Sequence, residues 1–279
     1  MSLIKLSKSA YFHNLSQITN KIGAKERVFI VLKDNAYGHG IAQIAPLASE
    51  FGIKRAITRT LDEAKTISQF FDEILILSHL VDGYEDENAK FIYAINDINA
   101  LNIIKPGVRA HISIDTLMHR HGILKDQLPQ ALKIAKERNI NICGAYTHYS
   151  SADILSANFN VQRQMFLECK AEFLRLCQNF NFKNLVFSSA NSAACERIQK
   201  GDFKDEYARI GIAQFGYGQF NDSLKLKPVL SLWAKRLSAR VLKKGQSVGY
   251  GGAFSANDDM AIATYDLGSG DGLLRYDGR

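Results

Sequence analysis

Cysteine is scarce in this chain of 279 residues, and the few cysteines exclude two kinds of site. The sequence contains neither a Cys-x-x-Cys pair nor the ligand spacing of a zinc site. A chain of this length buries enough apolar surface to fold without disulfide bonds. We therefore expect free thiols, a reducing and cytoplasmic compartment, and no metal centre. The cysteines are Cys143, Cys169, Cys177 and Cys195.

Two further absences concern membranes and nucleic acids. No apolar run approaches the length of a membrane span, and Met1–Leu6 carries no signal-peptide core. Net charge is +7, but the lysines and arginines are interspersed with acidic residues and form no basic arm. We therefore expect neither a membrane nor a nucleic-acid partner. A cleft that attracts a phosphate-bearing cofactor or a carboxylate explains the positive charge more simply.

The chain does contain a regular alternation of apolar strand segments with helical segments. Such alternation implies a parallel sheet, and eight strands are the number that closes a (β/α)8 barrel. We expect this barrel to span residues 1–221. The expected strands are Val28–Lys33, Arg55–Thr58, Glu73–Ser78, Phe91–Ile95, Ala110–Asp115, Ile142–His148, Leu185–Ser189 and Arg209–Phe215. The clearest helices are Ser9–Lys21, Gln43–Phe51, Leu61–Phe71, Leu128–Glu137 and Asn160–Asn179.

The pattern changes after Gly218, where the helical segments stop. Pro228–Leu242 is a long extended run, and Ser247–Phe254 and Met260–Leu267 follow it as further strand segments. We therefore expect a second, all-β domain over residues 222–279.

The stretch from Val28 to Gly40 is the most informative part of the chain. Five apolar residues, VFIVL, deliver Lys33 to the end of the first strand, and a glycine-bearing loop follows. Strand ends in such a barrel open into the ligand site. A lysine with apolar neighbours there can lose its proton and form a Schiff base with a carbonyl compound. Taken alone, the pattern also fits a solvated lysine leaving a strand.

Several other polar residues follow the expected strand ends. The loops after strands seven and eight commonly bind phosphate in this fold, and Ser192 and the Gly211–Ile212 backbone lie there, with Tyr37 as another hydroxyl donor. Arg209 cannot give up its proton, so a pyridine nitrogen facing it would remain a neutral acceptor. Each signal is weak alone, and His148 also fits a satisfied core histidine. The rim candidates are Lys33, Arg120, His148, Asn191, Ser192 and Arg209.

The segment Lys33–Gly40, KDNAYGHG, closely resembles the pyridoxal-phosphate lysine motif of the alanine racemases, with Asp34 where that family usually has alanine. The resemblance covers essentially the whole chain. It implies a fold type III pyridoxal-phosphate enzyme that interconverts L-alanine and D-alanine, supplies D-alanine for peptidoglycan, and works as a homodimer with shared active sites. The other matching segments are Asp115-Thr116 with Arg120, Ala190–Ala193, Arg209–Ile212, Lys227–Val229 and Gly249–Gly251.

The same resemblance implies roles for the candidates. Lys33 would bind the cofactor and move a proton on one face of the substrate. Arg209 would hold the pyridine nitrogen, with His148 orienting it, and Arg120 would approach the substrate carboxylate. The expected cofactor-binding residues are Lys33, Tyr37, His148, Asn191, Ser192, Arg209, Gly211 and Ile212.

Tyr250 lies between glycines in the expected β domain. Racemisation requires a base on each face of a planar carbanion, and a tyrosine can serve the face opposite Lys33. The resemblance implies that Tyr250 reaches the site from the partner subunit. Without the barrel motifs, an ordinary hairpin tyrosine would explain it equally well.

The sequence departs from the family in further places. Ser113 stands where many members carry a carbamylated lysine that orients the arginine, so another group must hold Arg120. Ser188 replaces a histidine, and Ser269 replaces a tyrosine within Gly268–Gly272. The chain stops at Arg279, before the family's last active-site tyrosine, so we expect the β domain to be partial.

Three alternatives remain open at this point. A pyridoxal-phosphate decarboxylase uses the same barrel but usually has a cysteine in its second domain, whereas the last cysteine here is Cys195. A non-catalytic pyridoxal-phosphate carrier resembles the barrel alone and lacks a Gly-Tyr-Gly segment. His119 and His121 could instead be metal ligands, although His-x-His is a weak signal.

Overall fold

The chain folds into two units, which are described separately. The computed structural model describes residues 2–203 and 206–274. One unit comprises residues 8–229, and the other comprises the described residues of the ranges 1–7 and 230–279. We expected the division near residue 222, but it follows Val229. Arg279, at which the expected β domain ends, lies outside the described residues, as do residues 275–278.

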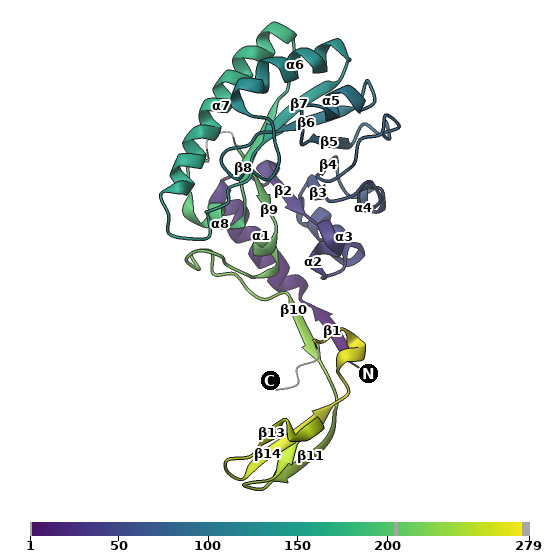
Figure 1. Cartoon of the computed structure of the whole chain (residues 1–279), viewed down its shortest axis with the longest axis vertical. Coiled ribbons are helices and arrows are strands. Elements are labelled where there is room, and N and C mark those ends of the chain that lie inside the picture. The colour runs from purple at the N-terminus through teal and green to yellow at the C-terminus, as the bar shows by residue number, and fades with distance from the viewer. Residues whose placement is uncertain (1, 204–205, 275–279) are drawn as a thin grey trace. The chain divides into compact units, whose positions relative to one another are not determined.

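Eight parallel strands close into a barrel in the larger unit (Figure 1), which confirms the predicted fold. The strands follow one another in chain order, and the last pairs with the first through Phe29 and Arg209. Most of their residues are buried on both faces, as the apolar runs predicted. The strands are β2 (Val28–Val31), β3 (Arg55–Thr58), β4 (Glu73–Ile76), β5 (Phe91–Ile95), β6 (Arg109–Ser113), β7 (Asn141–Tyr146), β8 (Val186–Ala190) and β9 (Tyr207–Ile210).

Helices and short turns connect the strands on the outside of the barrel. The helix predicted over Leu61–Phe71 is shorter, and a loop joins β4 to β5. The α-helices are α1 (Lys8–Ile22), α2 (Lys33–Tyr37), α3 (Ile41–Phe51), α4 (Leu61–Ile67), α5 (Ala100–Ile103), α6 (Leu128–Glu137), α7 (Asn158–Phe180) and α8 (Ser192–Arg197). The 3₁₀ turns of this unit are η1 (Lys25–Arg27), η2 (Lys125–Gln127) and η3 (Ile212–Phe215).

The last barrel strand is shorter than the sequence predicted. We expected it over Arg209–Phe215, but β9 ends at Ile210 and the chain turns into η3. The cause is Gln214, whose buried amide donates hydrogen bonds to the carbonyls of Val31 (2.8 Å) and Gly211 (2.9 Å). A side chain that satisfies buried carbonyls in this way stabilises the turn over a longer strand.

A carboxylate between two guanidinium groups joins the amino ends of three strands. Glu73, the first residue of β4, accepts a hydrogen bond from Arg55 Nε of β3 at 2.6 Å and another from Arg109 of β6. All three side chains are largely buried, with 17–25% of their surface exposed. Burial raises the pKa of Glu73, but Arg109 and Arg55 outweigh it and leave that pKa below its ordinary value.

We expect Glu73→Gln to destabilise the barrel by about 2 kcal/mol at neutral pH, because it leaves two largely buried cations without their anion. The lowered pKa means that this stabilisation is fully present above the unfolded pKa and is lost as pH falls through the folded pKa. Urea unfolding of both proteins at about pH 7 and about pH 3 measures the difference. A difference that stays the same at both pH values would contradict the assignment.

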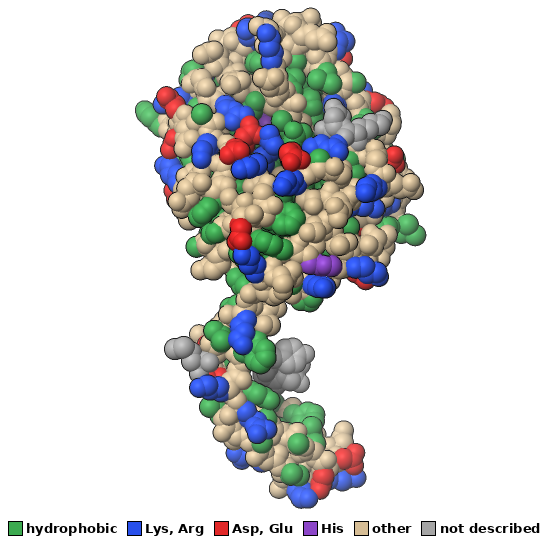
Figure 2. Space-filling model, turned by 180° about the vertical axis from the view of Figure 1, so that it is seen from behind, with side chains coloured by type: hydrophobic (Ala, Val, Ile, Leu, Met, Phe, Trp, Pro, Cys, Tyr) green, Lys and Arg blue, Asp and Glu red, His purple; other side chains and the backbone are tan. Residues whose placement is uncertain are grey.

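The smaller unit is built from pairs of antiparallel strands. β1 (Leu3–Leu6) pairs with β10 (Leu230–Trp233), which is why the first residues belong to this unit. β11 (Arg236–Leu242) pairs with β14 (Met260–Tyr265), and β12 (Ser247–Val248) with β13 (Phe254–Ser255). The 3₁₀ turns η4 (Tyr250–Gly252) and η5 (Ser269–Asp271) complete it. Hydrophobic side chains are spread over the face of this unit that Figure 2 shows. Trp233, Leu237 and Val241 of this unit are each more than half exposed.

No helix among the described residues is both long enough and apolar enough to span a lipid bilayer.

Candidate active site

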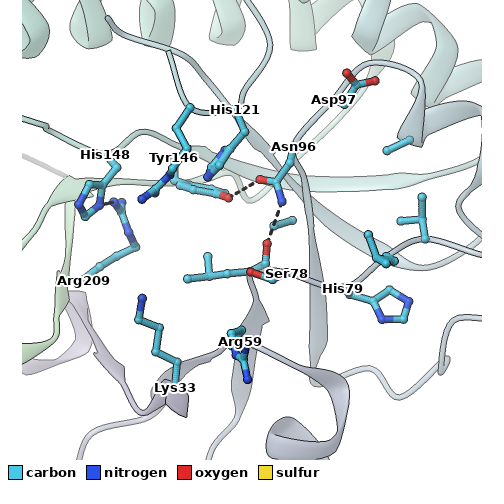
Figure 3. A pocket seen from close by; sticks show the side chains of 16 residues that line it. Lys33, Arg59, Ser78, His79, Asn96, Asp97, His121, Tyr146, His148 and Arg209 are labelled. Carbon is cyan, nitrogen blue, oxygen red and sulfur yellow. Dashed lines mark hydrogen bonds between the residues drawn. The ribbon is translucent and has the colours of Figure 1, made fainter. Parts of the chain in front are cut away.

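A cavity of about 540 Å³ opens at the carboxyl ends of the barrel strands. Lys33, Arg120, His148 and Arg209, four of the predicted site residues, line it together, and Figure 3 shows Lys33, His148 and Arg209 directed toward one another. They come from the ends of β2, β6, β7 and β9. This is the face on which barrels of this type bind ligands.

Lys33 enters the cavity from a tight junction after β2. The strand ends at Val31, and the N–H of Leu32 still donates to the carbonyl of Ile57 on β3 at 2.8 Å. Lys33 is half-buried, and its Nζ lies 5.8 Å from the ring centre of Tyr37. Lys33 therefore lies at a strand end, as predicted. Leu32 and Lys33, the last two residues of the predicted strand, lie beyond the end of β2.

The residues after Lys33 form a left-handed turn, which the sequence did not predict. Asp34, Asn35, Ala36 and Tyr37 all have φ between 53° and 54°, and Gly38 continues the turn at 82°. A left-handed conformation costs a residue with a Cβ on the order of 1–2 kcal/mol. Four such residues in a row persist only where surrounding contacts hold them, and such strain is typical of functional sites.

Packing and hydrogen bonds hold this turn. Asn35 Oδ1 accepts the N–H of Ile41 at 2.8 Å and so caps α3. The rings of Tyr37 and His39 lie against Phe215, with centres 5.9 and 3.9 Å away. Asp34, which replaces the family's alanine, forms an exposed ion pair with Arg59 at 2.8 Å.

Arg209 is 5% exposed and is held by four acceptors. It donates to the carbonyl of Ser188 at 2.6 Å, to Ser188 Oγ at 3.2 Å, to the carbonyl of Thr147, and to His148 Nδ1 at 3.3 Å. These contacts occupy its two terminal nitrogens, and no described residue accepts from its Nε–H. Burial lowers the pKa of Arg209 to about 10, so the group stays positively charged at neutral pH.

His148 is neutral in this setting. Burial, followed by the charges of Arg209, Arg120 and Lys33, lowers its pKa to about 3. Because arginine can only donate, Nδ1 of His148 must accept, and the ring proton therefore lies on Nε2. His148 thus lines the cavity as a neutral partner of Arg209.

Three of the residues predicted to bind phosphate lie together, although none of them is among the residues that line the cavity. The Tyr37 hydroxyl approaches Gly211 so closely that a Cβ at residue 211 would lie 2.5 Å from it, which explains the glycine. Ser192 Oγ accepts the N–H groups of Gly211 and Ala213, both at 3.2 Å, so its own proton is available to donate. Burial, and then the charge of Asp34, raises the pKa of Tyr37 to about 12, so it also remains a donor.

Asn191 and Ile212 flank this group. The Asn191 amide donates to the carbonyl of Tyr149 at 3.1 Å and accepts the N–H of Ala194 at 2.9 Å, so both of its ends are bound to the backbone. It caps α8 and fixes Ser192 at that helix's first position. Ile212 begins η3, where its N–H has no acceptor within the turn.

Arg120 lines the cavity without a hydrogen bond or ion pair among the described residues. Ser113 stands at the position of the family's modified lysine. Its hydroxyl forms a hydrogen bond with Nδ1 of His121, at 3.2 Å. Arg120 is exposed, so a bound anion would find its charge available. His119, the other histidine of the His-x-His pair, contacts Asp115 at 2.9 Å.

Sequence reasoning missed two polar residues at this end of the barrel. Tyr146, the last residue of β7, donates its hydroxyl to Asn96 Oδ1 at 2.9 Å, and Asn96 donates to the carbonyl of Leu77 at 2.8 Å. Asn96 directly follows β5, so its strand-end position could have identified it. Arg209 lies over the Tyr146 ring, 5.2 Å from its centre.

The metal alternative gains no support at His119 and His121, since no third ligand joins them among the described residues. The group that does meet the distance requirement is His79, Asp82 and Glu85, with ligand atoms within 4.8 Å of one another. Glu85 is already held there by the N–H groups of Asp82 (2.9 Å) and Lys105 (2.7 Å).

Tyr250 lies in the smaller unit. It follows Gly249, whose φ of 89° favours glycine, and is 90% exposed.

Two family models and a curated relative match the chain closely. The family model described as "Alanine racemase, N-terminal domain" matches residues 6–219, and that described as "Alanine racemase, C-terminal domain" matches residues 229–278. The chain is 58% identical to the alanine racemase of Campylobacter curvus over 278 residues, covering 100% of this chain and 81% of that protein.

Solved structures agree with these matches. An alanine racemase from Bacillus anthracis with bound L-Ala-P superposes with a TM-score of 0.81 at 26% identity, covering 97% of this chain and 73% of that one. An alanine racemase from Bartonella henselae with covalently bound pyridoxal phosphate gives 0.80 at 23% identity, covering 98% and 77%. With both family models matched and a relative this similar, the chain belongs to the alanine racemase family.

Proposed function

We propose that this chain is an enzyme that uses pyridoxal phosphate to interconvert L-alanine and D-alanine. One observation carries the proposal: Lys33 and Arg209 meet in a single cavity at the carboxyl ends of the barrel strands. Family membership supports the same reaction.

The residues around the cavity fit pyridoxal phosphate. Lys33 offers an amine to an aldehyde. The Arg209 Nε–H lacks a protein acceptor and suits a pyridine nitrogen, which can only accept from it. Tyr37 and Ser192 retain hydroxyl protons beside Gly211, where side-chain bulk is excluded, so they suit a phosphate.

When bound, the cofactor withdraws electrons from the Cα of the amino acid and makes its proton easier to remove. Arg209 keeps its proton and so leaves the pyridine nitrogen unprotonated. This moderates the electron withdrawal and should limit side reactions such as transamination. The neutral His148 and the carbonyls of Thr147 and Ser188 keep the guanidinium in place. Arg120, exposed and unpaired, would bind the substrate carboxylate.

We infer a mechanism with two bases. Lys33 would move the Cα proton on one face of the substrate, and Tyr250 of a second copy would serve the other. Two titratable groups close to Arg209 are poor bases: His148 has a pKa near 3, and Tyr146 is bound to Asn96 with its pKa raised by burial.

A homodimer with shared active sites fits the smaller unit. Its paired strands leave large apolar side chains exposed, including Trp233, Leu237 and Val241. Exposed apolar patches of this kind mark protein–protein interfaces.

We also propose that the enzyme is cytoplasmic and supplies D-alanine for peptidoglycan. Its four cysteines are buried free thiols, which suit a reducing compartment.

The pyridoxal-phosphate carrier alternative is less well supported. A carrier protein would resemble the barrel alone, whereas this chain also matches a racemase C-terminal domain.

The direct test is to incubate the purified protein with pyridoxal phosphate and L-alanine and to separate the products on a chiral column. We expect a racemic mixture, and the same mixture from D-alanine. Carbon dioxide release without D-alanine would support a decarboxylase, and cofactor binding without turnover would support a carrier.

Replacing Arg209 with lysine provides a pH test of the pyridine contact. The ordinary pKa of lysine is about two units below that of arginine, and the same burial would lower it further. The lysine should therefore lose its charge within the assay range. We expect the affinity of Arg209→Lys for pyridoxal phosphate to fall between about pH 7 and about pH 9, relative to the wild-type protein. Fluorescence titration measures this, and parallel pH profiles would contradict the assignment.

A further inference from the structure

A carboxylate outside the cavity holds the left-handed turn that carries Lys33 and Tyr37. Glu63, in the first turn of α4, accepts the N–H of Asn35 through Oε1 at 3.2 Å. Its other oxygen, Oε2, accepts the N–H groups of Arg59 at 2.8 Å and Thr60 at 3.4 Å. One side chain therefore joins the strained turn to the start of a neighbouring helix.

Glu63 is itself held in a fixed position. Its N–H donates to Thr60 Oγ1 at 3.3 Å, which completes a capping box at the start of α4. α4 follows β3, and β3 pairs with β2 through Val31 and Ile57. The position of Oε1 is thus set by the same barrel strands that deliver Lys33.

The hydrogen bond to Asn35 favours the strained conformation. Asn35 has φ of 54° and ψ of 45°, in the left-handed region, which asparagine tolerates singly but which is unfavourable for the run of four residues of which it is part. A different backbone conformation there would direct its N–H away from Glu63. A carboxylate is a strong acceptor for an N–H, so losing this contact shifts the balance toward other conformations.

We propose that Glu63 is a positioning residue: by binding the N–H of Asn35 it holds the left-handed turn and thereby directs Lys33 Nζ and the Tyr37 hydroxyl toward the cavity. The competing explanation is that Glu63 only caps α4. The consequence for cofactor binding rests on the proposed function, whereas the conformational consequence does not.

The first measurement is amide hydrogen exchange of the cofactor-free protein. In Glu63→Ala, we expect the peptide that contains residues 34–40 to exchange several-fold faster than in the wild type. Two control variants separate this from capping. Thr60→Ala breaks the other half of the capping box and leaves the Asn35 contact. Asp62→Asn removes a neighbouring carboxylate of the same helix turn. Both should change exchange in residues 34–40 far less than Glu63→Ala does.

The second measurement is the affinity of each variant for pyridoxal phosphate. We expect about tenfold weaker binding by Glu63→Ala. Glu63→Gln should recover part of the loss, because its amide oxygen can still accept from Asn35. If the alanine variant does not fold, the same two measurements on Glu63→Gln test the inference.

The outcomes distinguish this inference from the proposed function. If wild-type protein does not bind pyridoxal phosphate, the proposed function fails, and the exchange data alone decide the role of Glu63. If the wild type binds it but Glu63→Ala matches Thr60→Ala in both exchange and affinity, Glu63 is a helix cap and the inference is overturned.

Discussion

Lys33→Ala is expected to lower racemisation by at least about a thousandfold, because it removes both the amine that binds the cofactor and the base on one substrate face. After borohydride treatment in the presence of pyridoxal phosphate, the wild-type protein should carry the cofactor on the peptide that contains Lys33. The variant should carry none. Peptide mass spectrometry detects the label, and chiral chromatography measures the activity.

Lys133→Ala is a suitable control for this change. Lys133 is an exposed lysine of α6 whose ammonium lies 3.9 Å from Glu137, so its replacement should leave folding and activity nearly unchanged. Thermal unfolding of both variants checks that the loss is chemical. A label on a lysine other than Lys33, with activity retained in Lys33→Ala, would refute the assignment.

The barrel could be predicted from the sequence because its strands are short, fully buried apolar runs. β3 and β5 occupy the residues predicted for them, since each run is bounded by polar or turn residues. The rim could also be predicted, because residues that follow parallel strands must meet at one end of a barrel. Lys33 and His148 were identified in this way, and Asn96 could have been. Arg209 was predicted at the start of the last strand, but β9 begins at Tyr207 and ends at Ile210, so Arg209 lies near the carboxyl end.

Other features depend on contacts between distant parts of the chain. The left-handed turn of Asp34–Tyr37 opposes local preference, and it exists because Glu63 and Phe215 hold it. The turn after β9 likewise depends on Gln214, whose amide donates a hydrogen bond to the carbonyl of Val31, a residue far away in the sequence. A pattern of apolar residues contains no information about either contact.

The smaller unit shows a third limit. Three extended runs after residue 228 were predicted, but β1 was not, and its pairing with β10 joins residues more than 200 positions apart. The apolar side chains that predicted these strands are largely exposed in the described chain. Side chains that a partner covers give the same sequence pattern as those buried within one chain, so the pattern does not distinguish the two.

Subunit mixing is expected to restore activity to two inactive variants if Tyr250 acts across the dimer. Tyr250→Phe keeps the ring and removes only the phenolic oxygen, so by itself it should lower racemisation by about a hundredfold or more. In a mixed dimer with Lys33→Ala, one site would combine both defects and the other would have neither. Random exchange makes about half of all dimers mixed, so activity should rise to about a quarter of that of the wild-type protein.

The result depends on where Tyr250 acts, which makes the experiment decisive. If Tyr250 served the site of its own chain, each chain of a mixed dimer would still contain one defective site, and no activity would return. Native mass spectrometry of subunits with different isotope labels verifies that exchange has occurred. A mixture of Lys33→Ala with Lys33→Ala protein made separately controls for effects of handling. Recovery of activity only in the mixed pair would show that Tyr250 acts in the partner's cavity. Subunit exchange without recovery of activity would show that it acts in the cavity of its own chain.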